Sequence, residues 1–137
     1  MTSTIVYKGN LISELTHTQS GTVVLNEPPV DNHGKGECFS PTDLFATTLG
    51  SCMITTMALR AQLSNMNLNF DGTTAEITKT MSIDAPRRIT AIDCVLFFTE
   101  NFKATDDQKE QLIRIAHSCP VEKSLHPDIK VNVVFNW

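Results

Sequence analysis

The chain has 137 residues, of which 41% are hydrophobic and 19% charged, and its formal net charge is −4. This length and composition predict one globular domain over residues 1–137, with enough apolar residues for a core. An acidic chain without a basic run argues against nucleic acid as a partner, since phosphate binding needs clustered positive charge. Residues 1–8 lack the basic and then apolar order of a signal peptide, so we expect a cytoplasmic protein.

The chain contains four cysteines and four histidines. In a reducing compartment, disulfides tend to be transient and catalytic rather than structural. No Cys-x-x-Cys or His-x-x-x-His pair occurs, so we expect neither a bound metal nor another cofactor.

Short strands are expected at residues 5–8, 11–17 and 22–26. The turn sequences Gly9-Asn10 and Gln19-Ser20-Gly21 separate them, as in an antiparallel meander. Residues 27–39 then form a long loop rich in Pro and Gly, and loops of this length in small domains are often functional.

A long helix is expected to begin after Ser40 and to end near Ser64. Ser40 is suited to the N-cap, Pro41 to the first helical position, and Asp43 completes a capping box. Only Arg60 is charged in the body of this helix. This predicts that nearly every face of the helix is covered by protein, one of them by a partner subunit. Its uncharged stretch is shorter than the roughly 20 residues of a membrane span, so we interpret it as a core helix.

The second half of the chain alternates strands and helices. The expected elements are strands at 69–83 and 87–99 around the turn 84–86, a helix capped by Thr105 and Gln108, a short helix at 121–125 opened by Pro120, and a last strand at 129–135. The resulting fold class is α+β, with mainly antiparallel sheets and a long buried central helix.

Two motifs carry a family resemblance. They are Ser40-Pro41-Thr42-Asp43-Leu44-Phe45-Ala46, followed by Gly50-Ser51-Cys52, and Ser118-Cys119-Pro120-Val121-Glu122-Lys123-Ser124-Leu125. With this element order, the chain resembles the OsmC/Ohr family of hydroperoxide-reducing proteins. The resemblance implies an OsmC-like fold and an intertwined homodimer with two active sites at the subunit interface. It also implies that Cys52 is the peroxidatic thiol and Cys119 the resolving thiol.

The chain departs from the peroxidase branches of that family at the activating residues. These branches use an arginine and a glutamate; Thr42 stands where the glutamate usually follows the proline, and no arginine precedes Cys52. The chain therefore resembles a divergent OsmC-like branch. The candidate activating or orienting residues are His33, Lys35, Glu37, Thr42 and Asp43.

Attack on a peroxide requires Cys52 as a thiolate, and a free cysteine is only a few per cent ionised at neutral pH. Cys52 lies about three turns inside its helix, beyond the reach of the N-terminal dipole, and apolar burial raises a thiol pKa. Activation thus needs a cation or hydrogen-bond donor from elsewhere. Lys35 or His33, oriented by Glu37, is the expected source.

Cys119 precedes Pro120 and is expected to be the N-cap of the short helix, where exposed N–H groups favour a thiolate. The expected cycle oxidises Cys52 to a sulfenic acid, which Cys119 converts to a disulfide, and an external dithiol then reduces it. Phe39, Leu49 and Met53 are the expected lining of an apolar substrate pocket.

The remaining cysteines and histidines have less specific settings. Cys94 is expected in the core, and Cys38 is a lesser alternative partner for Cys52. His117 and His126 are expected to be surface or capping residues.

Two functions from different classes remain open at this point. The first is a thiol peroxidase acting on organic hydroperoxides in a cytoplasmic homodimer. The second is a module without peroxidase activity that binds a small hydrophobic or electrophilic ligand in a cysteine-lined pocket at the dimer interface.

Overall fold

The computed structural model describes all residues from Met1 to Trp137. The chain divides into two compact units, Met1–Phe45 and Ala46–Trp137, and each is described by itself.

The first unit is built on a three-stranded antiparallel meander. Its strands are β1 (Ser3–Gly9), β2 (Ile12–His17) and β3 (Val23–Asn26), which agree with the predicted strands to within two residues. The β1–β2 turn has positive φ angles, 88° at Gly9 and 52° at Asn10, a backbone conformation that Gly and Asn tolerate best.

Helix α1 (Pro41–Leu63) begins with the predicted capping box. Ser40 Oγ accepts a hydrogen bond from the Asp43 backbone N–H at 3.0 Å, and the Asp43 carboxylate accepts one from the Ser40 N–H at 2.9 Å. Two backbone N–H groups at the helix start are thereby satisfied, which explains why the helix begins here.

The second unit contains a three-stranded sheet with the order β4-β5-β6. Strands β4 (Thr74–Met81) and β5 (Ile89–Phe97) are antiparallel, whereas β5 and β6 (Lys130–Asn136) are parallel. The first of these strands was expected from residue 69 and begins only at Thr74. The Thr73 N–H donates to the Phe70 carbonyl, so a turn replaces the start of the strand.

Two further helices join β5 to β6. Helix α2 (Asp106–Ala116) has the predicted capping box, in which Thr105 and Gln108 exchange side chain to backbone hydrogen bonds. Helix α3 (Pro120–Lys123) is a single turn with Cys119 as its N-cap and Pro120 at its first position, as predicted.

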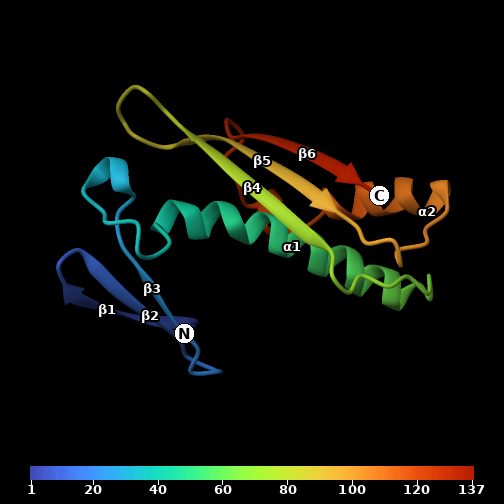
Figure 1. The fold of residues 1–137 in the computed structure, drawn as a ribbon, viewed down its shortest axis with the longest axis horizontal. Coiled ribbons are helices and arrows are strands. Elements are labelled where there is room, and N and C mark those ends of the chain that lie inside the picture. Colours follow the sequence, from blue (N-terminus) through green and yellow to red (C-terminus); the bar gives the residue numbers. More distant parts are fainter. The chain divides into compact units, whose positions relative to one another are not determined.

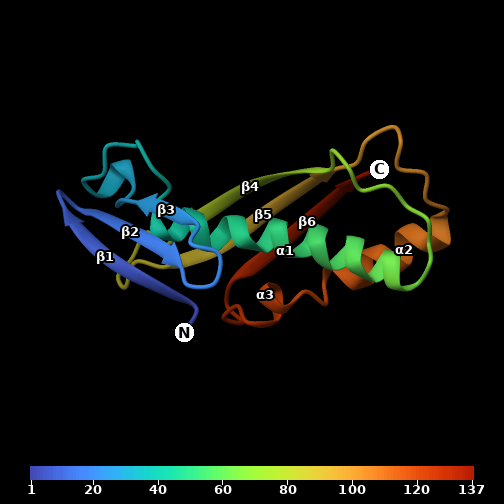
Figure 2. The ribbon, with the colours of Figure 1, turned by 90° about the horizontal axis from the view of Figure 1, so that it is seen from below.

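The core of the second unit lies between its sheet and its helices. Figures 1 and 2 show α1 running along one face of the sheet of β4, β5 and β6. The buried side chains of α1 recur at helical spacing on one face. They are Ala46, Leu49, Gly50, Met53, Met57 and Ala61. From β5 and α2, core positions are Ile92, Cys94, Leu96, Leu112 and Ala116.

Some large apolar side chains of α1 lie outside this buried face. Phe45, Leu59 and Leu63 are 44%, 55% and 66% exposed. By length and composition α1 could also cross a membrane, but the core helix of a soluble protein has the same properties. Its continuous buried face against a sheet favours the core helix.

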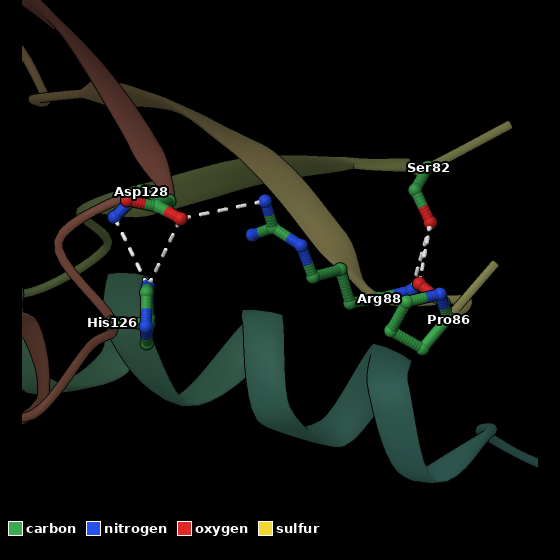
Figure 3. Close-up of polar contacts among 5 residues, drawn as sticks. All are labelled: Ser82, Pro86, Arg88, His126 and Asp128. Atoms are coloured by element: carbon green, nitrogen blue, oxygen red, sulfur yellow. Dashed lines mark hydrogen bonds and ion pairs between the residues drawn. The ribbon is translucent and has the colours of Figure 1, made fainter. Parts of the chain in front are cut away.

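An exposed polar cluster joins the hairpin between β4 and β5 to the segment that precedes β6 (Figure 3). Ser82 Oγ accepts from the Arg88 N–H at 2.9 Å and donates to the Pro86 carbonyl at 3.2 Å. Arg88 also pairs with Asp128 at 3.5 Å, and His126 Nδ1 lies 3.6 Å from the same carboxylate. The side chains of Arg88, Asp128 and His126 are each 46% exposed or more, so these contacts add little stability. His126 is therefore a surface residue, as expected.

Candidate active site

The fold brings the side chains of Cys52 and Cys119 together. Cys52 lies on α1 and Cys119 lies between α2 and α3, and the Cys52 side chain is near enough to Cys119 to raise the pKa of its thiol. Both are free thiols, Cys119 fully buried and Cys52 partly exposed. A reactant could therefore reach Cys52 more easily than Cys119.

Cys119 is the N-cap of α3, as predicted, but burial opposes the stabilisation that the cap gives its thiolate. The Glu122 backbone N–H donates to Cys119 Sγ at 3.4 Å, as the capping position requires. Burial outweighs this bond and, together with the neighbouring Cys52 side chain, raises the pKa of the Cys119 thiol. The motif predicted the capping geometry and could not predict the burial.

Glu122 and His117 form a polar pair next to this thiol, and neither was predicted as a site residue. His117 Nδ1 donates to both carboxylate oxygens of Glu122, at 3.1 and 3.2 Å. The Glu122 side chain is 17% exposed and that of His117 is 40% exposed. The signal in the sequence was an acidic residue three positions after Cys119, inside the motif itself.

Cys94 is a third thiol in this part of the core. It lies on β5, is fully buried, and burial raises its pKa to about 11, with a smaller contribution from Cys119. A thiol with this pKa is almost wholly protonated at neutral pH, so Cys94 is a packing residue, as expected.

A polar neighbour of Cys52 is Thr56, one helical turn further along α1. Thr56 Oγ1 lies 3.9 Å from Cys52 Sγ, where either group could donate. A hydroxyl that donates to the sulfur would favour a thiolate.

The loop 27–39 is organised by Glu27, a residue that was not predicted. Glu27 is 3% exposed, and its carboxylate accepts hydrogen bonds from the backbone N–H groups of Lys35, Glu37 and Cys38 at 3.1, 2.5 and 3.0 Å. These bonds, that of Lys35 foremost, lower the pKa of Glu27 below its ordinary value of 4.5. The loop backbone is thus fixed around a buried carboxylate.

The expected activating residues lie in the unit Met1–Phe45. His33 adopts φ 70° at the end of a short 3₁₀ turn, η1 (Val30–Asn32), and Lys35 and Glu37 follow it on the same loop. Thr42 Oγ1 lies 3.1 Å from Ser40 Oγ and Asp43 completes the helix cap, so both belong to the start of α1. The reach of any of these residues toward Cys52 stays a prediction.

The three expected pocket residues have different exposures. Leu49 and Met53 are fully buried in the core, and Phe39 is 52% exposed. Their role in substrate binding stays a prediction. The structure also has a hollow of about 470 Å³ at the end of α1, and no predicted site residue lines it. Its lining is Ala58, Ala61, Gln62, Asn65, Asn67, Leu68, Asn69, Phe70 and Asp71.

Comparison with known protein families identifies the fold and the cysteine motifs together. Residues 34–134 match the model of the OsmC-like protein family, and this range contains both Cys52 and Cys119. The chain belongs to the OsmC-like family. No curated protein matches the chain.

Solved structures of OsmC-like proteins share the fold over the whole length. A protein of Psychrobacter arcticus 273-4, described as a candidate osmotic stress induced and detoxification response protein, is 42% identical; the match covers 99% of this chain and 96% of that chain, with a TM-score of 0.91.

Two more distant relatives are named for hydroperoxide resistance. The organic hydroperoxide resistance protein OsmC of Legionella pneumophila is 15% identical, covers 100% and 98% of the two chains and has a TM-score of 0.77. OhrB of Bacillus subtilis is 16% identical, covers 99% and 98% and has a TM-score of 0.71. At sequence identities this low, the similarity shows a shared fold and does not extend to function.

Proposed function

We propose that this OsmC-like protein is a thiol peroxidase that reduces organic hydroperoxides through a disulfide between Cys52 and Cys119. The observation that carries the proposal is the proximity of these two free thiols, which come from elements far apart in the sequence. One is partly exposed, as a peroxidatic thiol must be, and the other is buried with its pKa raised by that burial, as suits a resolving thiol at rest.

The cycle balances without a metal or organic cofactor. Cys52 thiolate attacks the O–O bond of the hydroperoxide, forms an S–O bond and, with one proton taken up, releases the alcohol. The Cys119 thiol then displaces hydroxide from the sulfenic acid; its proton and the hydroxide leave as water, and the S–S bond forms. An external dithiol reduces this disulfide by two successive exchange steps and is itself oxidised to a disulfide.

The active protein is proposed to be a homodimer in the cytoplasm. Every buried hydrophobic residue of the chain lies at position 46 or later, so the sheet of β1, β2 and β3 has no apolar core of its own. Its side chains Ile5, Val6, Tyr7, Val23, Val24 and Leu25 are between 38% and 66% exposed. A three-stranded sheet this open needs another surface, and a second copy of the chain, with the same uncovered α1 face, can supply it.

Activation of Cys52 is proposed to come from the loop that Glu27 organises. A cation on this loop, Lys35 or protonated His33, would favour the thiolate if it reached Cys52 in the same or the partner subunit. Glu37 would orient that cation. Thr56 supplies a further donor within hydrogen-bonding range of the sulfur.

The second candidate function is a binding module without peroxidase activity. It is favoured by the position of Thr42, where the peroxidase branches of the family have a glutamate, and by the apolar setting of the two thiols. Such a module would hold a small hydrophobic or electrophilic molecule against Cys52.

Counting thiols during exposure to cumene hydroperoxide separates the two functions. We expect the reduced wild-type protein to lose two thiols per chain, because one peroxide oxidises both Cys52 and Cys119. Cys52→Ser should lose no thiols over the same time, and Cys119→Ser should accumulate a sulfenic acid that dimedone traps. Cys38→Ser serves as the matched control, and it should behave as wild type if Cys119 is the resolving thiol.

Wild-type thiols that persist for minutes in excess peroxide would overturn the peroxidase proposal. Loss of two thiols in Cys119→Ser but not in Cys38→Ser would instead assign the resolving role to Cys38.

A further inference from the structure

The hollow at the end of α1 lies within the second unit, and none of its lining residues belongs to the proposed peroxidase site. It is bounded by the last turns of α1 and by residues 65–71, a segment that turns back beside the helix before β4 (Figure 1). Its volume of about 470 Å³ falls in the range of small-molecule sites, about 300–1,000 Å³. Side-chain amides and apolar residues contribute four residues each to the lining, and the ninth is Asp71. The hollow therefore offers both polar and apolar contacts to a ligand.

Hydrogen bonds at the end of α1 fix the backbone of the first part of this lining. The Met66 N–H donates to the Ala61 carbonyl at 3.0 Å. The Asn65 N–H donates to the Gln62 carbonyl at 3.1 Å, which completes the Schellman pattern of a helix end. Asn65 and Asn67 have φ angles of 52° and 50°, a left-handed conformation that Asn adopts more readily than most residues. The backbone that carries these amides is thus ordered without a ligand.

Phe70 supplies the largest apolar side chain of the lining. Its ring packs edge-on against the rings of Phe102 and Phe98, with centroids 5.0 and 6.2 Å apart. Next to it, the Asp71 N–H donates to Asn69 Oδ1 at 2.9 Å. The aromatic neighbours hold the Phe70 ring in position, so binding would not require this side chain to become ordered.

The polar groups of the lining suit hydroxyl groups. A side-chain amide both donates and accepts hydrogen bonds, as a hydroxyl does. The amides of Gln62, Asn65 and Asn67 are exposed and make no hydrogen bond within the chain, so they are available to a ligand. No Lys, Arg or His lines the hollow, and the Asp71 carboxylate repels an anion. Charge and hydrogen-bonding capacity together favour a neutral ligand with several hydroxyls.

We propose that this hollow binds a neutral polyhydroxylated molecule of the size of a mono- or disaccharide. The amides of Gln62, Asn65 and Asn67 exchange hydrogen bonds with its hydroxyls, and the Asp71 carboxylate accepts others. The Phe70 ring contacts C–H groups of the ligand. The proposal does not depend on the peroxidase function, because no cysteine lines the hollow.

The test is a titration of the reduced, ¹⁵N-labelled protein with D-glucose and with trehalose, followed by NMR. The backbone amide resonances of residues 65–71 report binding. We expect them to shift and to saturate with one of these probes, with a dissociation constant on the order of 1 mM. The titration involves no peroxide, so its result and that of the thiol count are independent.

Glycine substitutions separate the amide side chains from the backbone that carries them. Asn65→Gly combined with Asn67→Gly keeps the left-handed conformation and removes both amides. We expect the double variant to bind the probe about tenfold more weakly, through the loss of two or more hydrogen bonds. Asn10→Gly is the matched control, since Asn10 has the same φ of 52° in the β1–β2 turn and does not line the hollow. It should bind as wild type does.

The charge of the ligand is tested with D-glucuronate, which has the glucose ring with a carboxylate in place of the hydroxymethyl group. We expect glucuronate to bind about threefold or more weakly than glucose, because Asp71 repels it. Asp71→Asn should reduce this difference. This variant keeps the backbone N–H bond to Asn69.

Shifts that rise without saturating, or a dissociation constant unchanged by the two glycines, would overturn the site. Glucuronate that binds as tightly as glucose would overturn the assignment of a neutral ligand. The amide spectrum of each variant also shows whether the fold is retained.

Discussion

At the residue scale, two glutamates differ in what their carboxylates contact. The carboxylate of Glu122 accepts from His117, whereas the buried carboxylate of Glu27 accepts from backbone N–H groups of its own loop, at Lys35, Glu37 and Cys38. Glu27 holds in place the segment that carries the expected activating side chains, so its effect on function is indirect. Glu27 was missed in the sequence because an isolated glutamate has no pattern to distinguish it, whereas Glu122 lies inside the Cys119 motif and was not singled out.

Glu27 makes the loop sensitive to acid. Its pKa is lowered in the folded protein below the ordinary 4.5, so its contribution to stability is full above that pH and is lost as the pH falls through the folded value. We expect Glu27→Gln to have a lower Tm than wild type at pH 7, and the difference to narrow below pH 4. Calorimetry across this range measures it.

Glu37→Gln is the control for this experiment, since Glu37 lies on the same loop with an exposed side chain. An equal loss of Tm in the two variants, or a difference that persists in acid, would contradict the role of the Glu27 carboxylate.

At the scale of elements, helix α1 and strand β4 pack very closely at Gly50. A Cβ atom at this position would lie 2.7 Å from Ile77 Cδ1 and 3.2 Å from Ala75 Cβ, both closer than ordinary contact. Gly50 therefore permits the approach of the helix that carries Cys52 to the sheet. Its cost in helix propensity, about 1 kcal/mol relative to Ala, is offset by this packing.

We expect Gly50→Ala to lower the free energy of unfolding by about 1–2 kcal/mol, because overpacking outweighs the gain in helix propensity. Denaturant unfolding measures the change. Ile77→Val removes the Cδ1 atom and should restore part of the loss when the two changes are combined. Ser51→Ala, at the exposed neighbouring position, is the control. A Gly50→Ala variant more stable than wild type would contradict the close packing.

At the scale of the whole molecule, the chain leaves much apolar surface uncovered. The sheet of the first unit and the outer face of α1 both expose large hydrophobic side chains. Monomeric proteins rarely expose so much contiguous apolar surface, and this is the physical reason for proposing a homodimer.

Sedimentation velocity should give a dimer for wild type at micromolar concentration. We expect Leu59→Glu combined with Leu63→Glu to raise the dissociation constant of the dimer more than about a hundredfold. Two leucines that become buried in the dimer interface would contribute roughly 3 kcal/mol or more to the free energy of association. Ile83→Glu is the control, because Ile83 is fully exposed on the β4–β5 hairpin. A monomeric wild type, or a double variant that remains dimeric, would contradict this interface.

The sequence by itself determined the order of the elements and the residues at which the helices begin. Ser40 with Asp43, Thr105 with Gln108, and Pro120 act within a single helical turn, so their effect can be predicted without the fold. The cysteine motifs likewise indicated Cys52 and Cys119, and the family model matched the range that contains them.

Only the tertiary structure decided how these cysteines meet and in which form. The burial of Cys119 depends on segments far apart in the chain. It raises the pKa of the thiol by more than the N-cap hydrogen bond lowers it. The pairing of Glu122 with His117 depends on the angle between α2 and α3, and the contact of Glu27 with its loop joins residues up to 11 positions apart. Local patterns predict helices and strands, but the protonation of a buried group depends on everything packed around it.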